Sequence, residues 1–286
     1  DGVAGMRLLE KSFSRDPQHQ GITAPWCIAN RRTERLTHPE APMSQFKKFT
    51  RIVQGQIKAT PTVFNELAKA LKDKKNQHPD YVSSFQAPST IFNQRVSASR
   101  RFAAQSFELA RLRRIAQHFN VTINDVVLAI CAGALREYLI KQQALPKKPM
   151  IAMVPTSIRQ DDSDVSNRIS MILANLATHL DDRMERLMTI RRSVLNAKQR
   201  FERMTTDQIL SYSAFVYSPA GFNILSGLMP KRQAFNLVIS NLPGPKESLY
   251  WNGARLDAIY PASIVLDGQA LNITMTSYAG KLEVGL

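Results

Sequence analysis

Through the second half of the chain, short apolar segments alternate with longer segments of helical periodicity. Leu109–Phe119 carries apolar side chains at helical spacing, and the long apolar segment Ile123–Gln143 follows Thr122, a residue that favours the N-cap of a helix. A third helix is predicted from Asp181 to about Arg203, because its acidic opening pair suits the positive end of the helix dipole. Strands are predicted at Ala103–Glu108, Met150–Pro155, Ile169–Leu176, Phe235–Ser240, Ala254–Ile259, Ala270–Thr276 and Lys281–Leu286. Such a mixture predicts an α/β or α+β fold.

The first hundred residues are less regular. Val3–Phe13 has the spacing of an amphipathic helix, and Pro17 follows it closely, as expected after a helix end. A linker is predicted from about Asp16 to Ser44, then a basic helical region over Gln45–Leu71 and a polar loop over Lys72–Pro88. Further on, Thr206–Met229 is apolar and predicted helical, with an interruption at Pro219.

Composition excludes several classes of protein. The apolar share of 44% is ordinary for a globular chain, and no apolar run reaches the roughly 18–20 residues of a membrane span. The two cysteines, Cys27 and Cys131, lie far apart among apolar neighbours, which predicts buried thiols and a reducing compartment such as the cytoplasm. No cluster with the spacing of metal ligands, phosphate loop or serine-hydrolase elbow is present, so neither a metal nor a bound cofactor is expected.

The chain carries a formal net charge of +15, and much of it lies in one region. Such a field attracts polyanions: anionic lipid surfaces, phosphate-bearing molecules such as coenzyme A, or nucleic acid. The absence of zinc-finger or RNP-type sequences disfavours nucleic acid, and a solvated surface that aids solubility remains an alternative. The cations of this basic region are Arg31, Arg32, Arg35, Lys47, Lys48, Lys72, Lys74, Lys75, Arg100, Arg101, Arg111, Arg113 and Arg114.

Three short motifs carry candidate chemistry, and each has a plain structural alternative. Asp1-Gly2 precedes the first predicted helix, where the dipeptide also suits an ordinary turn. Asn124-Asp125 lies in the first turn of the long helix, where both residue types also serve as capping residues. Ser240–Pro245, which reads Ser-Asn-Leu-Pro-Gly-Pro, follows a strand that its Pro-Gly-Pro turn also simply ends.

Two hydroxyl residues, Thr276 and Ser277, and five histidines are further candidates for chemistry. Thr276 and Ser277 end an alternating strand, where hydroxyls are most often inert. His179 precedes Asp181-Asp182, a pattern more typical of a strand end before a helix cap than of a catalytic triad. None of the histidines stands four residues before the Asp of an Asp-Gly pair: they are His19, His38, His78, His118 and His179.

In this order the three motifs resemble the wax ester synthase/diacylglycerol acyltransferase family. That family has an active-site motif His-His-x-x-x-Asp-Gly, of which Asp1-Gly2 would be the end, followed by signatures similar to Thr122–Arg136 and Ser240–Pro245. Leu242 stands where the third signature usually has valine. The resemblance places the catalytic histidine ahead of Asp1, so we expect a chain of this extent to be inactive by itself.

The resemblance implies a chloramphenicol-acetyltransferase-like fold of two α/β sandwich halves with an active-site channel between them. It divides this chain into the end of the first half with the start of the crossover (1–44), a basic helical crossover (45–100) and the C-terminal acyltransferase half (101–286). The implied activity is acyl transfer from acyl-CoA, a substrate, to a fatty alcohol or diacylglycerol. The apolar segment Thr206–Met229 would then suit an acyl or alcohol channel, or else a plain core helix.

The resemblance also implies roles for individual residues and partners. Asp1, Gly2 and Asn124 would belong to the catalytic site, and the substrate would contact Asp125, Ser240, Asn241, Thr276 and Ser277. In the related acyltransferase superfamily a hydroxyl from such a strand stabilises the tetrahedral oxyanion, which makes Thr276 and Ser277 candidates for that role. A cytoplasmic location peripheral to the inner membrane or to lipid inclusions is expected, and a homodimer is possible. The rival hypothesis is a non-catalytic module that binds an anionic lipid surface or an acidic partner.

Overall fold

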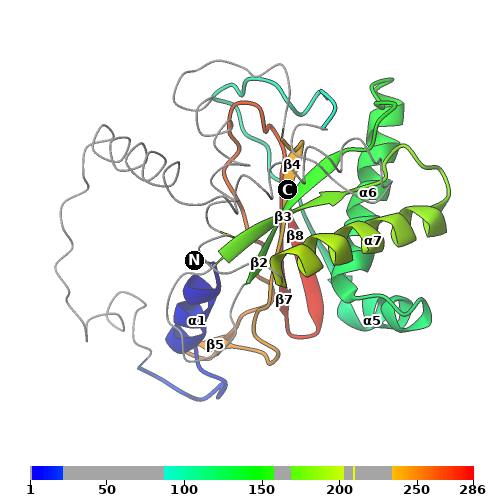
Figure 1. The fold of residues 1–286 in the computed structure, drawn as a ribbon. Coiled ribbons are helices and arrows are strands. Elements are labelled where there is room, and N and C mark those ends of the chain that lie inside the picture. Colours follow the sequence, from blue (N-terminus) through cyan, green and yellow to red (C-terminus); the bar gives the residue numbers. More distant parts are fainter. Residues whose placement is uncertain (1, 22–86, 158–168, 203–208, 210–233) are drawn as a thin grey trace, which may run out of the picture.

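A mixed six-stranded sheet forms the centre of the structure, a computed structural model that describes residues 2–21, 87–157, 169–202, 209 and 234–286 (Figure 1). Its strands are β1 (Ala104–Glu108), β2 (Ile151–Ser157), β3 (Ile169–Asn175), β4 (Leu237–Leu242), β7 (Asn272–Tyr278) and β8 (Lys281–Gly285), in the order β1-β8-β7-β4-β2-β3. β4 pairs in parallel with β2 and with β7, and the remaining pairs are antiparallel. The prediction of an α/β fold is confirmed.

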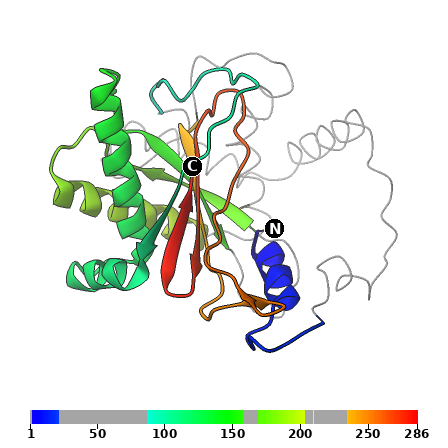
Figure 2. The same ribbon diagram turned by 180° about the vertical axis from the view of Figure 1, so that it is seen from behind.

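Helices lie on both sides of this sheet. One side carries α5 (Leu109–His118), α6 (Ile123–Lys141) and α7 (Arg183–Glu202), and the other carries α1 (Gly2–Ser12), as the opposite views of Figures 1 and 2 show. Among the described helices, none is long and apolar enough by itself to cross a membrane. Only α5 and α6 taken as a pair pass by length and composition, and they are bent by 102°.

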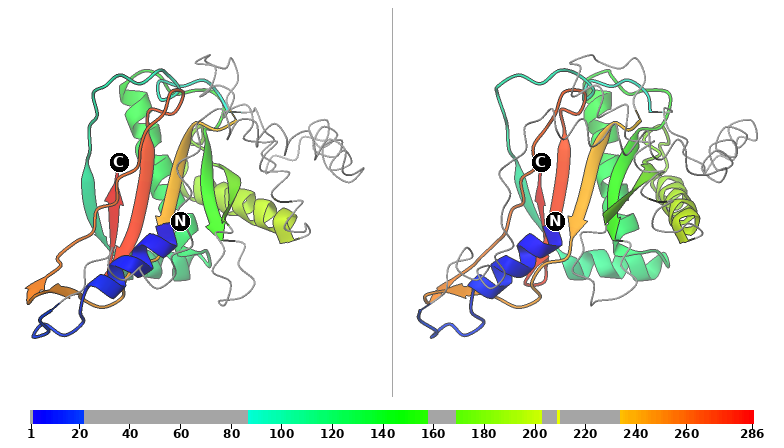
Figure 3. Two further views of the ribbon diagram at one scale, coloured as in Figure 1. Left: turned by 90° about the vertical axis from the view of Figure 1, so that its left-hand side faces the viewer. Right: turned by 60° about the vertical axis from the view of Figure 1, so that its left-hand side comes forward.

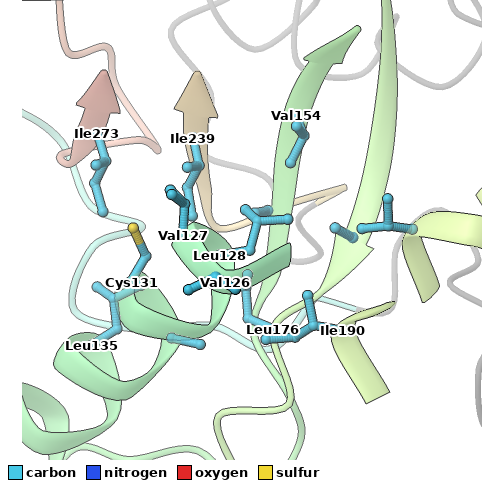
Figure 4. Packing of buried hydrophobic residues seen from close by; sticks show 14 of the residues in the cluster. Val126, Val127, Leu128, Cys131, Leu135, Val154, Leu176, Ile190, Ile239 and Ile273 are labelled. Atoms are coloured by element: carbon cyan, nitrogen blue, oxygen red, sulfur yellow. The ribbon is translucent and has the colours of Figure 1, made fainter. Parts of the chain in front are cut away.

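The core lies between the sheet and the layer of α5, α6 and α7. Val126, Val127, Leu128 and Cys131 of α6 face Ile239 of β4 and Ile273 of β7 in Figure 4, and all belong to one buried cluster. Burying such side chains contributes about 1.5–3 kcal/mol each relative to leaving them exposed. The buried Cys131 confirms one of the two predicted thiols, whereas Cys27 lies outside the described residues.

One predicted strand is wrong. Ala254–Ile259 forms only the short strand β6 (Ala254–Arg255), which pairs with β5 (Tyr250–Trp251) in a separate two-stranded sheet. The Leu256 N–H donates to the carbonyl of Leu249 at 2.8 Å, and the chain then leaves the pairing. The other predicted strands agree with the structure within two residues at each end.

Several predictions concern residues outside the described ranges. These are the basic helical region 45–71, most of the linker and of the loop that flank it, and all of 206–229 except residue 209. The domain boundaries at 44 and 100 also stay predictions.

Candidate active site

The first turn of α6 is held by a reciprocal capping box. The Thr122 hydroxyl and backbone N–H donate to Oδ2 of Asp125 at 2.7 and 2.9 Å, and the Asp125 N–H donates back to the Thr122 hydroxyl at 3.1 Å. This exchange satisfies groups that a helix start otherwise leaves unpaired. Asp125 is buried, and the structure therefore gives it a capping role. Its predicted contact with substrate stays a prediction.

Asn124, next to Asp125, is placed differently. It is half-buried in the same first turn, and its side chain has no hydrogen-bonding partner among the described residues. An amide both donates and accepts hydrogen bonds, and a helix N-terminus favours negative charge nearby. The Asn124 side chain therefore makes no hydrogen bond within the described part of the fold.

Ser240 and Asn241 end β4 and are both half-buried. Parallel pairing with β7 sets Ser240 beside Thr274 and Asn241 beside Met275. Neither Ser240 nor Asn241 has a side-chain hydrogen bond to another described residue. The third signature therefore presents two more uncommitted polar side chains at the end of the sheet.

The hydroxyls of Thr276 and Ser277 in β7 form structural hydrogen bonds. The fully buried Thr276 donates to the carbonyl of Leu242 at 3.1 Å, and the Gly244 N–H donates to the Ser277 hydroxyl at 3.1 Å. A Cβ on Gly244 would lie 2.2 Å from the Ser277 carbonyl oxygen, so the turn approaches β7 as closely as only glycine allows. Both hydroxyls thus fix the Pro-Gly-Pro turn, and their predicted role toward an oxyanion is not tested.

These elements end on one side of the molecule. β2 and β4 point toward the end of the sheet where α5 lies in both views of Figure 3, and α5 leads directly into the first turn of α6. In Figure 4, Val127 packs near Ile239 and Ile273, so the beginning of α6 lies against β4 and β7. The structure therefore brings Asn124, Ser240 and Asn241 to the same end of the sheet.

The first signature reaches this end from the other face. Gly2 is the first residue of α1, which lies at the same end of the sheet in Figures 1 and 3, whereas Asp1 is outside the described residues. The catalytic roles expected for Asp1 and Gly2 stay predictions.

His179 lies on a helix-capping loop, as its sequence pattern indicated. Arg136 donates to the carbonyls of Thr178 and His179 and pairs with Asp181 at 3.0 Å, and the Glu185 N–H donates to Asp182 at 2.7 Å. Partial burial lowers the pKa of His179 below its ordinary value, in competition with the nearby Glu185 carboxylate. Its neighbours serve the loop and the α7 start, so the capping interpretation is confirmed.

Sequence reasoning missed one buried carboxylate near this end. Glu283 of β8 is fully buried beside Thr276, accepts a short hydrogen bond from the Ser106 hydroxyl, and leaves Oε1 without a partner among the described residues. The Ser106 hydroxyl also lies 2.9 Å from the Tyr260 hydroxyl, which ties the loop at Tyr260 to the sheet. A charged residue between two apolar ones in Leu-Glu-Val was the available signal.

An apolar groove of about 560 Å³ lies between α6 and the β1–β8–β7 part of the sheet. Its rim includes the exposed side chains of Phe107, Ile130 and Tyr138, so it opens to the surface beside the helical layer. An exposed apolar surface of this kind is typical of a contact face. Within the described residues, no group of three His, Cys, Asp or Glu side chains is arranged to hold a metal ion.

The sheet, its helical layer and the signature turn define an α/β domain, and comparison with known proteins specifies the family. The wax ester synthase/diacylglycerol acyltransferase catalytic domain matches residues 1–127, and the C-terminal domain of the same family matches residues 165–286. The chain therefore belongs to the wax ester synthase/diacylglycerol acyltransferase family.

Individual relatives agree over the full length of the chain. An O-acyltransferase of Acinetobacter baylyi is 67% identical over 286 residues, and a probable diacylglycerol O-acyltransferase of Mycobacterium tuberculosis is 40% identical over 292. The solved wax ester synthase/diacylglycerol acyltransferase from Marinobacter aquaeolei matches 99% of this chain with a TM-score of 0.71 and 38% identity. The chain spans 62% of the length of the two relatives and 58% of the solved chain.

Proposed function

We propose that the whole protein transfers a long-chain acyl group from acyl-CoA to the hydroxyl of a fatty alcohol or of diacylglycerol. Family membership supports this activity, as do the names of relatives that match the chain from end to end. The observation that carries the proposal is that Asn124, Ser240 and Asn241 lie at the same end of the sheet, with their side chains unpaired among the described residues.

Acyl transfer to a hydroxyl requires two things of such a site. A general base must accept the proton of the attacking hydroxyl, a role that the family's motif gives to a histidine ahead of the Asp-Gly pair. Negative charge that develops on the thioester carbonyl oxygen must also be stabilised. The amide of Asn124 and the positive end of α6 are suited to that second task. The direct attack needs no metal and no acyl-enzyme, and acyl-CoA enters as a substrate.

The test measures free coenzyme A released by the whole protein from palmitoyl-CoA with hexadecanol or with diacylglycerol. We expect release that depends on the acceptor and falls about tenfold or more in Asn124→Ala, a loss of about 1.4 kcal/mol of transition-state stabilisation. Gln117→Ala, an exposed change on α5, is the matched control and should leave release unchanged. The absence of acceptor-dependent release would refute the enzyme and favour the non-catalytic lipid-binding module.

The proposal includes a location at the cytoplasmic face of a lipid surface, the inner membrane or lipid inclusions. It is supported by exposed arginines in the described part of the basic region, at Arg100 and Arg101 and along α5 at Arg111, Arg113 and Arg114. Clustered cations add about 1 kcal/mol each near an anionic surface. The homodimer is likewise a proposal, which the molar mass of the purified whole protein in solution would test.

A further inference from the structure

The short hairpin of β5 and β6 is anchored to the end of β7. The buried Tyr278 hydroxyl accepts from the Leu249 N–H at 2.9 Å and donates to the Leu256 carbonyl at 2.6 Å, so one side chain bonds both ends of the hairpin. Tyr278 directly follows Thr276 and Ser277, which hold the Pro-Gly-Pro turn. The end of β7 therefore fixes both the signature turn and the hairpin that follows it.

The hairpin has a geometry that leaves little freedom at its tip. Asn252 and Gly253 connect the two strands with φ values of 47° and 84°, the positive pair that defines a type I′ turn. This turn matches the natural twist of two antiparallel strands, so it closes a hairpin whose strands have only two residues each. A Cβ on Gly253 would lie 3.5 Å from the carbonyl oxygen of Pro17, so the tip lies against the chain that follows α1.

The arm also holds the end of α1 directly. Ser14 and Tyr250 exchange two backbone hydrogen bonds of 3.0 and 2.8 Å, and the rings of Phe13 and Trp251 meet edge to face with centroids 5.2 Å apart. Near the base of the arm, Arg15 pairs with Glu247 at 3.0 Å, but both side chains are largely exposed and the pair contributes little. The contacts that orient the arm relative to α1 are therefore the Ser14–Tyr250 backbone hydrogen bonds and the Phe13–Trp251 ring contact.

We propose that the β5–β6 hairpin is a positioning arm that sets α1, and with it the first signature, against the Ser240–Pro245 turn. This inference rests on the proposed function, since the two signatures must act on one reacting group although they lie at opposite ends of the sequence. A displacement of about 1 Å between such groups can cost up to about a hundredfold in rate. Tyr250 and Trp251 are the positioning residues, and they touch no reacting atom.

A role in positioning differs from a role in general stability because the arm lies outside the core. None of the residues of β5 and β6 belongs to the buried clusters of the described structure, and Trp251 is 38% exposed. Loosening the contact should therefore leave the sheet and α5–α7 folded. It should lower the rate of acyl transfer at saturating substrate more than it changes the melting temperature.

The first experiment compares Trp251→Ala, Trp251→Phe and Arg255→Ala in the whole protein. Trp251→Ala should lower kcat about tenfold or more with KM for palmitoyl-CoA nearly unchanged, and Trp251→Phe should restore most of kcat because a ring again meets Phe13. Arg255→Ala, on the same hairpin, is the control and should behave as wild type, because within the described residues the Arg255 side chain bonds the exposed Asp257. Wild-type kcat in Trp251→Ala would overturn the proposal, and so would a loss that simply follows the melting temperature.

The second experiment replaces the ring contact with a covalent one. Ser14 and Tyr250 form a hydrogen-bonded antiparallel pair, whose Cα atoms lie about 5.5 Å apart in general. That separation suits a disulfide. In a Cys27→Ser background, Ser14→Cys with Tyr250→Cys should form the disulfide on mild oxidation and restore kcat to Trp251→Ala, and reduction should remove the rescue.

The two experiments separate this inference from the proposed function. If the wild-type protein shows no acyl transfer, the proposed function fails, and disulfide formation alone still tests whether the arm holds α1. Failure of the disulfide to form in the folded protein would overturn the positioning arm whatever the activity. Formation of the disulfide without rescue of kcat in an active protein would also overturn it.

Discussion

Asn124 and Asp125 are neighbours in one helical turn, and the structure gives their side chains different roles. Asp125 closes the capping box with Thr122, so Asp125→Ala should cost about 0.5–2 kcal/mol of folding free energy. Asn124 has no described hydrogen-bonding partner, so Asn124→Ala should leave the melting temperature near wild type and lower kcat/KM about tenfold. Thermal unfolding and coenzyme A release, measured on both variants, separate the roles. The capping interpretation would extend to Asn124 if its variant were destabilised with normal turnover.

Cys131 is a thiol that burial makes unreactive. Desolvation raises its pKa to about 12, so almost none of it is thiolate near neutral pH. In a Cys27→Ser background, we expect no alkylation of the native protein by iodoacetamide at pH 8 and full alkylation after denaturation, both measured by intact mass. Rapid native labelling would show that the interface between α6 and the sheet opens.

At the scale of elements, the signature turn depends on a close approach between two segments. A Cβ on Gly244 would meet the Ser277 carbonyl at 2.2 Å, so Gly244→Ala must shift the turn or β7 and should lower the melting temperature by several degrees. Gly5→Ala is the matched control. Nothing lies within 4 Å of a Cβ there, and alanine favours a helix by up to about 1 kcal/mol. Equal melting temperatures for the two variants would show that the turn is loosely held.

The elements that sequence predicted well are those that carry their own local signals. α6 has a capping residue and a long apolar face, and α7 has an acidic first turn. The hairpin escaped prediction because strands of two residues show no periodicity. The pair Asn252-Gly253 was nevertheless a strong hairpin signal.

The candidate site was predictable only in part for a similar reason. The signatures identified Asn124, Ser240 and Asn241 as polar groups at element ends, which the structure places at one end of the sheet. The tasks of Thr276 and Ser277 follow instead from the parallel register of β4 with β7. That register joins segments far apart in sequence, so no local pattern contains it.

At the scale of the whole molecule, the net charge of +15 is unevenly distributed. α5 packs an apolar face against the core and exposes Arg111, Arg113 and Arg114 to solvent. An enzyme whose substrates reside in lipid gains local concentration by docking there, and exposed cations give that docking a strong dependence on salt. The expected salt dependence allows lipid binding to be tested separately from catalysis.

We expect the whole protein to bind vesicles that contain anionic phospholipid and to dissociate as salt rises from about 0.1 M to about 1 M, because the Debye length falls from about 10 Å to about 3 Å. Replacing Arg111, Arg113 and Arg114 together by glutamine should weaken cosedimentation with these vesicles at low salt. The same replacement of Arg183, Arg191 and Lys198 on α7 removes equal charge elsewhere and serves as the control. Vesicle binding that does not change with salt would contradict docking through α5. Equal weakening by both triple variants would contradict it as well, because the proposal requires that the position of the charges matters and not only their number.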